Sequence, residues 1–224
     1  MKIKAVLFDL DNTLVDFVEM KRKCCEQAAR AMVDSGLDMK LEDACDKLHK
    51  TYWEVGIESD TAFTEFLKRT IGKVDDKILA AAINAYLRTK NVLLEPYPNV
   101  ISTLTKLTKK GIVIGIVTDA PRLKAWQRLN AMKIHNLFDI VITPDDAGGL
   151  KTSQLPFKHV VKKLKMKPNE ILFVGDSIER DMKGAKKMGM ITALAKYSSN
   201  EKADPKIVDF VLSDIKEILH IIER

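Results

Sequence analysis

The stretch Ala5-Val6-Leu7-Phe8-Asp9-Leu10-Asp11-Asn12-Thr13 joins a run of four apolar residues to a polar loop with two aspartates. A short apolar run that stops at a polar loop is typical of a buried strand. We therefore predict a strand that ends at Phe8 and places Asp9 and Asp11 at its carboxyl end. Because the two aspartates are two positions apart, both side chains would point to one side if the extended conformation persists.

The segment 16–95 has a different period. Its apolar residues recur every three or four positions, which is typical of amphipathic helices. The first two helical stripes consist of Phe17, Met20, Cys24, Ala28 and Ala31, and of Leu41, Ala44, Leu48, Tyr52 and Val55. Two further helices follow before Glu95-Pro96-Tyr97-Pro98 ends the pattern. Tyr52 lies on the apolar stripe of its helix with Trp53 beside it, so for both rings we favour packing inside this helical segment over contact with a substrate.

Strands and helices alternate beyond Pro98. The predicted strands are Ile112–Val117, Asp139–Ile142, Ile171–Val174, Met190–Leu194 and Phe210–Leu212, with helices between them and a final helix from Asp214. Near-continuous apolar strands separated by helices indicate a parallel sheet that is covered on both faces. The predicted fold is therefore α/β, with a doubly wound parallel sheet. We predict a core domain of residues 1–15 and 96–224, with residues 16–95 inserted as an all-helical cap domain over the end of the sheet.

Polar residues gather after several predicted strands, where the ligands of open parallel sheets bind. Besides Asp9 and Asp11, they are Thr118, Asp119, Lys151, Asp176 and Asp181. Taken singly, an aspartate at a strand-to-helix junction is often a helix N-cap, and a lysine is most often a surface residue. Asp9, Asp11, Asp176 and Asp181 would place four carboxylates at one sheet edge. They would repel one another unless a divalent cation and a cation such as Lys151 neutralise them. Oxygen ligands without histidine or thiolate suit Mg²⁺.

Four segments carry a resemblance to a known family. They are Asp9-Leu10-Asp11-Asn12-Thr13-Leu14, Thr118, Lys151 and Gly175-Asp176-Ser177-Ile178-Glu179-Arg180-Asp181. In order and in position at strand ends, they resemble the four signature motifs of the haloacid dehalogenase (HAD) superfamily. The helical insertion after the first motif is similar to the cap of the subfamily that contains phosphoglycolate phosphatases and β-phosphoglucomutases. The sequence departs from the family pattern at Asp119, where Asn is more frequent, and at Thr152, where Pro is usual.

The resemblance implies a mechanism through an aspartyl-phosphate. Asp9 would be the nucleophile that attacks phosphorus, and Asp11 would be the general acid and base. Mg²⁺ would be held by the carboxylate of Asp9, the backbone carbonyl of Asp11 and the carboxylate of Asp176. Asp181 would assist through water or by orienting Lys151.

The resemblance also implies a pocket for the phosphoryl group. Lys151 and the hydroxyl of Thr118 would bind the phosphoryl oxygens and stabilise them as the ester bond breaks. Asp119 would line the same pocket through its backbone N–H. A carboxylate beside a phosphate weakens anion binding unless it points away or pairs, so the side chain of Asp119 is a departure that the structure has to explain.

These implications predict a Mg²⁺-dependent phosphatase of small phosphomonoesters, such as glycolate, triose or sugar phosphates. A phosphomutase or phosphotransferase with the same site is the nearest alternative. A dehalogenase is disfavoured, because a departing halide needs no proton and the dehalogenases of the superfamily lack an aspartate at the position of Asp11. A receiver-like signalling module is disfavoured because such modules have no place for the helical insertion.

Composition narrows the class of protein and of partner. The 224 residues are 46% hydrophobic and 30% charged, which excludes disordered, collagenous and mini-protein classes. The net charge is +6, but the excess lies beyond Pro96 on helical segments without interleaved aromatic residues, so we expect no nucleic-acid partner. The longest apolar runs are too short to span a bilayer and no signal-peptide pattern is present, so we expect a cytoplasmic protein without a membrane partner. No feature decides between a monomer and a homodimer.

Overall fold

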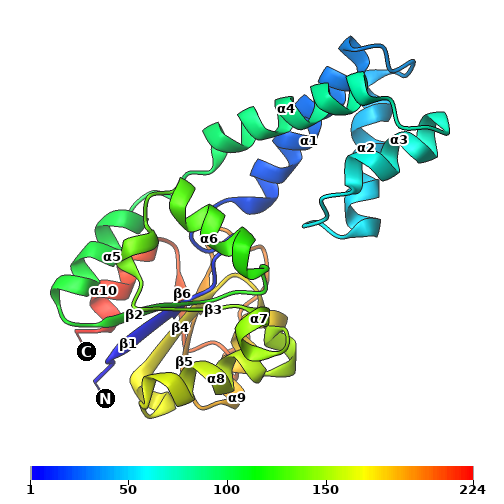
Figure 1. Ribbon diagram of the computed structural model, residues 1–224. Helices are drawn as coiled ribbons and strands as arrows, with labels where there is room; N and C mark the ends of the chain where they lie inside the picture. The colour runs from blue at the N-terminus through cyan, green and yellow to red at the C-terminus, as the bar shows by residue number, and fades with distance from the viewer. Residues whose placement is uncertain (1, 224) are drawn as a thin grey trace. The chain divides into compact units, whose positions relative to one another are not determined.

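The computed structural model describes residues 2–223, and the strands within that range form one six-stranded parallel sheet (Figure 1). The strands are β1 (Ala5–Phe8), β2 (Val113–Val117), β3 (Ile140–Ile142), β4 (Ile171–Gly175), β5 (Ile191–Ala195) and β6 (Phe210–Leu212). Their order in the sheet is β3-β2-β1-β4-β5-β6, so the first strand of the chain is a central one. Ala5 of β1 is level with Val113 of β2 on one side and with Ile171 of β4 on the other. The predicted doubly wound α/β fold is confirmed.

Helices cover both faces of this sheet. They are α5 (Val100–Lys109), α6 (Arg122–Ala131), α7 (Pro144–Ala147), α8 (Leu155–Leu164), α9 (Lys183–Lys187) and α10 (Ile218–Ile221). Figure 1 shows α5 and α10 on one face and α8 and α9 on the other. The short helix α7 was not predicted. It begins with a capping box in which Asp146 Oδ2 accepts from the backbone N–H of Thr143 at 3.0 Å, and also from the Thr143 hydroxyl at 2.6 Å.

The face under α8 and α9 is packed with large apolar side chains. The rings of Phe157 on α8 and Phe173 on β4 meet edge to face, with centroids 5.0 Å apart. Leu7 of β1 belongs to the same buried cluster. Full burial of side chains of this size stabilises the fold by about 1.5–3 kcal/mol each. Strands β1 and β4 are therefore held by a buried apolar core on this face.

Residue contacts divide the chain into two compact units. One unit runs to Asp16 and resumes at Glu95, and the other spans Phe17–Leu94. Within the first unit the two connecting segments are joined, because Val15 forms an antiparallel bridge with Pro96. The role of the second unit as a cap stays a prediction.

The second unit consists of helices. They are α1 (Phe17–Asp34), α2 (Leu41–Val55), α3 (Ala62–Ile71) and α4 (Asp76–Leu93). The carboxylate of Asp75 caps α4 by accepting hydrogen bonds from the backbone N–H groups of Lys77 and Ile78. None of the described helices combines the length and the apolar character that a transmembrane span needs.

The two aromatic residues predicted to pack in this unit behave differently. Tyr52 is buried, and its ring lies edge to face with that of Phe63 at a centroid distance of 5.6 Å. The expectation for Tyr52 is confirmed. Trp53 is 57% exposed, so the expectation for Trp53 is wrong. It sits one position off the buried stripe of α2, and its side chain turns to solvent.

Lys21 is a buried cation in the interior of the helical unit. Its Nζ donates to the hydroxyl of Tyr86 at 2.8 Å and lies 3.8 Å above the centre of the Tyr52 ring. Burial lowers the pKa of Lys21 to about 8, although the hydrogen bond and the ring face favour the charged form.

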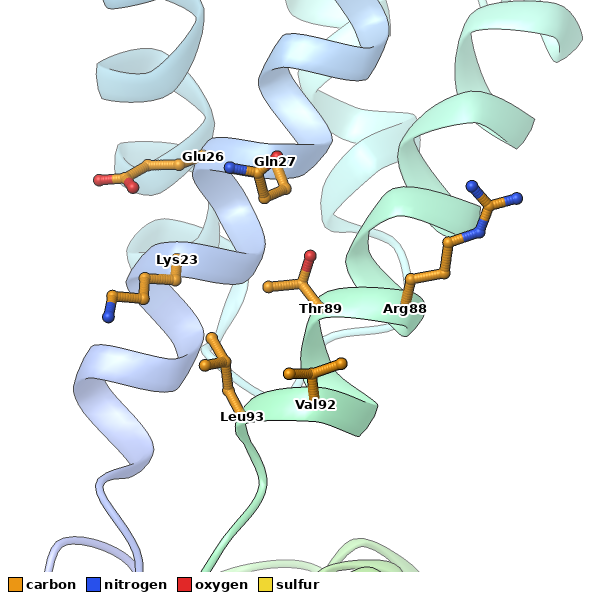
Figure 2. A pocket seen from close by; sticks show the side chains of 7 residues that line it. All are labelled: Lys23, Glu26, Gln27, Arg88, Thr89, Val92 and Leu93. Atoms are coloured by element: carbon orange, nitrogen blue, oxygen red, sulfur yellow. The ribbon is translucent and has the colours of Figure 1, made fainter.

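A surface groove of about 490 Å³ lies between α1 and α4 (Figure 2). Its lining comprises Lys23, Glu26 and Gln27 of α1 and Arg88, Thr89, Val92 and Leu93 of α4. The lining thus combines charged side chains of both signs with the apolar side chains of Val92 and Leu93 at the end of α4.

Candidate active site

Three predicted site residues stand directly after neighbouring strands of the sheet. Asp9 follows β1, Thr118 follows β2 and Asp176 follows β4. Asp9 is only 2% exposed, and its backbone N–H donates to the carbonyl of Val174 at 2.9 Å. Because β1 lies between β2 and β4, the parallel topology brings these residues to one edge of the sheet.

Lys151 reaches the same edge from a short 3₁₀ turn, Lys151–Ser153. Its side chain is 1% exposed, and Nζ lies 2.5 Å from Asp9 Oδ1 and 2.5 Å from Asp181 Oδ1. Burial alone would lower the pKa of Lys151, but the charges of Asp181, Asp9 and Asp119 raise it above its usual value. Lys151 is therefore a fixed cation between two carboxylates.

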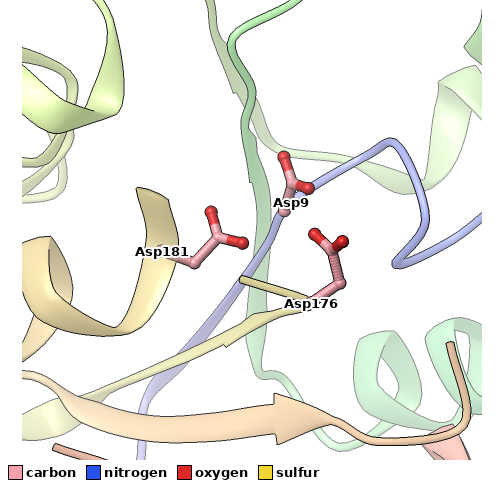
Figure 3. Close-up of side chains that lie close together, drawn as sticks. All are labelled: Asp9, Asp176 and Asp181. Atoms are coloured by element: carbon pink, nitrogen blue, oxygen red, sulfur yellow. The ribbon is translucent and has the colours of Figure 1, made fainter. Parts of the chain in front are cut away.

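Asp9, Asp176 and Asp181 each offer one carboxylate oxygen, and these three oxygens lie within 4.8 Å of one another (Figure 3). Burial raises the pKa of Asp9 well above its usual value; Lys151 opposes this, and the neighbouring carboxylates add to it. Burial, and then the charge of Asp181, raise the pKa of Asp176 to about 6. A cluster that resists ionisation in this way is stabilised by a bound cation. Three oxygen donors at this spacing fit a hard divalent cation.

The position of Asp181 depends on local backbone geometry. It lies in a π-helical turn, Ile178–Met182, that continues into α9, so the helical segment begins three residues before Asp181. The backbone N–H of Ser177 donates to Asp181 Oδ2 at 3.1 Å. A Cβ atom at Gly175 would lie 2.5 Å from the same oxygen. Only glycine at position 175 leaves room for this carboxylate, and wide turns of this kind are frequent at functional sites.

Asp11 departs from the arrangement that its spacing predicts. Strand β1 ends at Phe8, and Asn12 has a φ of 59°, so the extended conformation does not continue through the loop. The carboxylate of Asp11 accepts a hydrogen bond from Arg128 Nη1 at 2.9 Å. It is not part of the group formed by Asp9, Asp176 and Asp181. The charge of Asp11 is nevertheless among those that raise the pKa of Asp9. The expectation that all four carboxylates gather at this edge stays a prediction.

Thr118 and Asp119 face the turn that carries Lys151. The hydroxyl of Thr118 is buried and accepts from the backbone N–H of Ala120 at 3.1 Å. Asp119 Oδ1 accepts from the backbone N–H of Lys151 at 2.8 Å. The unusual carboxylate of Asp119 is therefore paired, and it ties the loop after β2 to the turn at Lys151.

Sequence reasoning missed Arg128, which is only 2% exposed. Ala125 and Leu129 are the other buried residues of α6, so Arg128 is a charged residue within an apolar helical stripe. An arginine within the helical stripe of Ala125 and Leu129 is the sequence signal that could have identified Arg128. A guanidinium at a core-facing position needs an anionic partner, and Asp11 is one.

The family model for haloacid dehalogenase-like hydrolases matches residues 6–195. The chain belongs to this family. A glyceraldehyde 3-phosphate phosphatase of Methanocaldococcus jannaschii is 35% identical over 226 residues, which cover 99% of this chain and 98% of the relative. A glyceraldehyde 3-phosphate phosphatase of Pyrococcus furiosus is 30% identical, over 100% of this chain and 94% of the relative.

Solved structures agree with this HAD fold. The HAD phosphatase of Thermococcus onnurineus has a TM-score of 0.70 at 24% identity, with 98% of each chain covered. A putative β-phosphoglucomutase of Thermotoga maritima has a TM-score of 0.74 at 18% identity, with 99% of each chain covered. Family membership and the phosphatase relatives confirm the predicted enzyme class, a HAD phosphatase of small phosphate esters.

Proposed function

We propose that this HAD phosphatase hydrolyses small phosphomonoesters through an aspartyl-phosphate formed on Asp9. The observation that carries this proposal is the placement of Asp9 at the end of the central strand. There it lies 2.5 Å from Lys151 and within a group of three carboxylates. A carboxylate held in a fixed position beside a buried cation is suited to in-line attack on a phosphoryl group.

In the first step, an oxygen of Asp9 forms a bond to phosphorus and the ester P–O bond breaks. Asp11 donates a proton to the departing oxygen, which leaves as an alcohol. In the second step, water attacks phosphorus, gives a proton to Asp11, and the bond between phosphorus and Asp9 breaks. Splitting the displacement into two steps lowers the barrier to each.

Lys151 and Thr118 are the proposed ligands of the phosphoryl oxygens. The Lys151 cation balances the charge of the phosphate beside Asp9, and the Thr118 hydroxyl donates to one of its oxygens. Asp119 contributes to this pocket by holding the backbone of Lys151 and by its own backbone N–H.

The cofactor of this site is proposed to be Mg²⁺. The carboxylates of Asp9 and Asp176 and the backbone carbonyl of Asp11 would hold it, and Asp181 would assist through water or through Lys151. These are hard oxygen donors without histidine or thiolate, as Mg²⁺ prefers. When bound, the ion neutralises the charge between the nucleophile and the phosphate.

Glyceraldehyde 3-phosphate is the proposed substrate. Relatives named for that activity are 30–35% identical over nearly the full length of the chain, as the Methanocaldococcus jannaschii and Pyrococcus furiosus proteins are. We assign selection of the leaving group to the helical unit Phe17–Leu94, acting as a cap that excludes water. Proposed partners are thus limited to small phosphorylated metabolites.

The test is phosphate release from a panel of phosphomonoesters that includes glyceraldehyde 3-phosphate, glycolate 2-phosphate and hexose phosphates. Wild type and Asp9→Asn are compared with Mg²⁺ and after chelation. Release that requires both Asp9 and Mg²⁺, and that is fastest with the triose phosphate, supports the proposal. Accumulation of a sugar bisphosphate in place of free phosphate would indicate the mutase alternative.

A further inference from the structure

Arg128 is a buried cation next to the proposed acid and base, and it has no assigned part in the reaction. Its side chain is 3% exposed, and Nη1 lies 2.9 Å from Oδ2 of Asp11. The two residues are 117 positions apart, so this contact depends on the tertiary fold. Because the side chain is almost fully buried, removing its anionic partner would be costly.

The backbone alone does not determine the direction of the Asp11 carboxylate. Asp11 lies beyond the end of β1, in a loop that turns at Asn12, and it forms an isolated bridge with Val15. Its side-chain direction is therefore not set by the pleat of a strand. The bond from Arg128 supplies a fixed donor for Oδ2 from a neighbouring helix.

We propose that Arg128 is a positioning residue that aims the Asp11 carboxyl group at the ester oxygen. This inference rests on the proposed function, because it concerns the proton that Asp11 gives to the leaving oxygen. In that step the bond from Asp9 to phosphorus forms, the ester P–O bond breaks, and the proton passes from Asp11 to the leaving oxygen. A guanidinium is suited to this role because its planar N–H groups have fixed directions, whereas an ammonium group rotates.

Leaving-group dependence separates this role from a merely structural one. An alkyl alkoxide needs a proton as it departs, whereas 4-nitrophenolate leaves without one. kcat/KM covers the steps up to departure of the leaving group and excludes hydrolysis of the aspartyl-phosphate. We expect Arg128→Met to lower kcat/KM for glyceraldehyde 3-phosphate by about 10- to 100-fold, and for 4-nitrophenyl phosphate by less than about 3-fold. Arg128→Lys should recover part of the loss.

Three further variants complete the experiment. Arg122→Met, on the same helix, removes an exposed arginine that pairs with Asp146, and it should leave the ratio of the two kcat/KM values unchanged. Asp11→Asn should show the same preference for the aryl ester. Arg128→Met added to Asp11→Asn should then cause little further loss, because Arg128 acts through Asp11.

The outcomes distinguish a failure of the proposed function from a failure of the role proposed for Arg128. A wild-type protein that releases phosphate from neither ester would refute the proposed function, and this inference with it. A wild-type protein active on both esters, with equal losses for both in Arg128→Met, would overturn the inference alone. If circular dichroism shows that Arg128→Met does not fold, Arg128→Lys provides the same comparison, and an unchanged ester ratio in that variant overturns the proposal.

Discussion

Nζ of Lys151 lies 2.5 Å from Oδ1 of Asp9, although 142 positions separate the two residues in the chain. Lys151 also contacts Asp181 at 2.5 Å, so one ammonium group compensates two buried carboxylates. Breaking a buried ion pair by removing one partner costs about 3–5 kcal/mol, because the other charge stays buried. The stability of this edge of the sheet therefore depends on Lys151.

Lys151→Met should lower the free energy of unfolding by about 3–5 kcal/mol, measured by urea denaturation at pH 7 in the presence of a chelator. The matched control is Lys158→Met, which removes an exposed lysine of α8 and should change stability by less than about 0.5 kcal/mol. Equal effects of the two substitutions would contradict the structural role of Lys151.

Asp9→Asn should abolish phosphate release while the fold stays intact. The neutral amide cannot act as a nucleophile toward phosphorus, but its oxygen still accepts from Lys151 and it removes one charge from the carboxylate group. Thermal unfolding should therefore show a midpoint no lower than that of wild type in chelator. A fully active Asp9→Asn enzyme would rule out the aspartyl-phosphate.

Asp119→Asn should keep most of the activity, within about threefold, because an amide oxygen can accept the bond from the backbone N–H of Lys151. Asp119→Ala leaves that N–H without its acceptor, at a cost of about 1–3 kcal/mol. We expect a lower unfolding midpoint and lower kcat in the alanine variant. If the asparagine variant is as impaired as the alanine variant, the negative charge of Asp119 is required, and not only its hydrogen bond.

Mg²⁺ should raise the unfolding midpoint of wild type, because a ligand at 100 times its Kd stabilises the folded state by about 2.7 kcal/mol. Asp176→Asn should reduce this shift, since it removes one of the three clustered carboxylates. Asp11→Asn is the matched control. Its carboxylate lies outside the cluster, so the Mg²⁺-dependent shift should persist. Loss of the shift in both variants would place the ion elsewhere.

The lowered pKa of Lys21 predicts that the stability of the helical unit depends on pH. Its pKa of about 8 lies below that of an unfolded lysine, so between about pH 8 and 10 the unfolded chain binds more protons. This contribution to stability therefore rises with pH over that window, by about 2 kcal/mol at most. The pKa of Lys21 is also influenced by the charges of Cys24, Cys25, Glu58 and Lys90. The rings of Tyr52 and Tyr86 lie against its ammonium group.

The measurement is the difference in unfolding free energy between wild type and Lys21→Met across pH 8 to 10. Because the surrounding cysteines and tyrosines are present in both proteins, the difference isolates the ammonium group. Wild type should gain stability relative to the variant as pH rises. A constant difference would show that Lys21 titrates as an exposed lysine does.

The sequence was sufficient for the fold and for the residues at strand ends. Apolar runs that stop abruptly at Asp9, Thr118 and Asp176 gave both the strands and their ends, since the strand period and the parallel topology leave little choice. The turn of the chain after Asp11 was not predictable in this way. It depends on a left-handed residue at Asn12, which a period of two cannot reveal.

Contacts between residues far apart in the sequence also could not be predicted from the periodicity of apolar residues. The pairing of Arg128 with Asp11, and of Asp119 with the backbone of Lys151, arises only once the loops are placed by the sheet. The position of Lys151 at the site was implied by family resemblance. Without the family resemblance, no sequence pattern distinguishes this lysine from a surface lysine.

The central place of β1 has a consequence for how the protein is made. Ala5 pairs with Val113 and Ile171, so the first strand to leave the ribosome gains its neighbours only after more than a hundred further residues have been added. At about 5–20 residues per second, its second neighbour follows on the order of ten seconds later. Throughout that interval the apolar strand Ala5–Phe8 lacks its sheet. Nascent chains should therefore depend on chaperone protection or on temporary burial of this strand, and slowing translation after β1 should increase aggregation more than slowing it after β4.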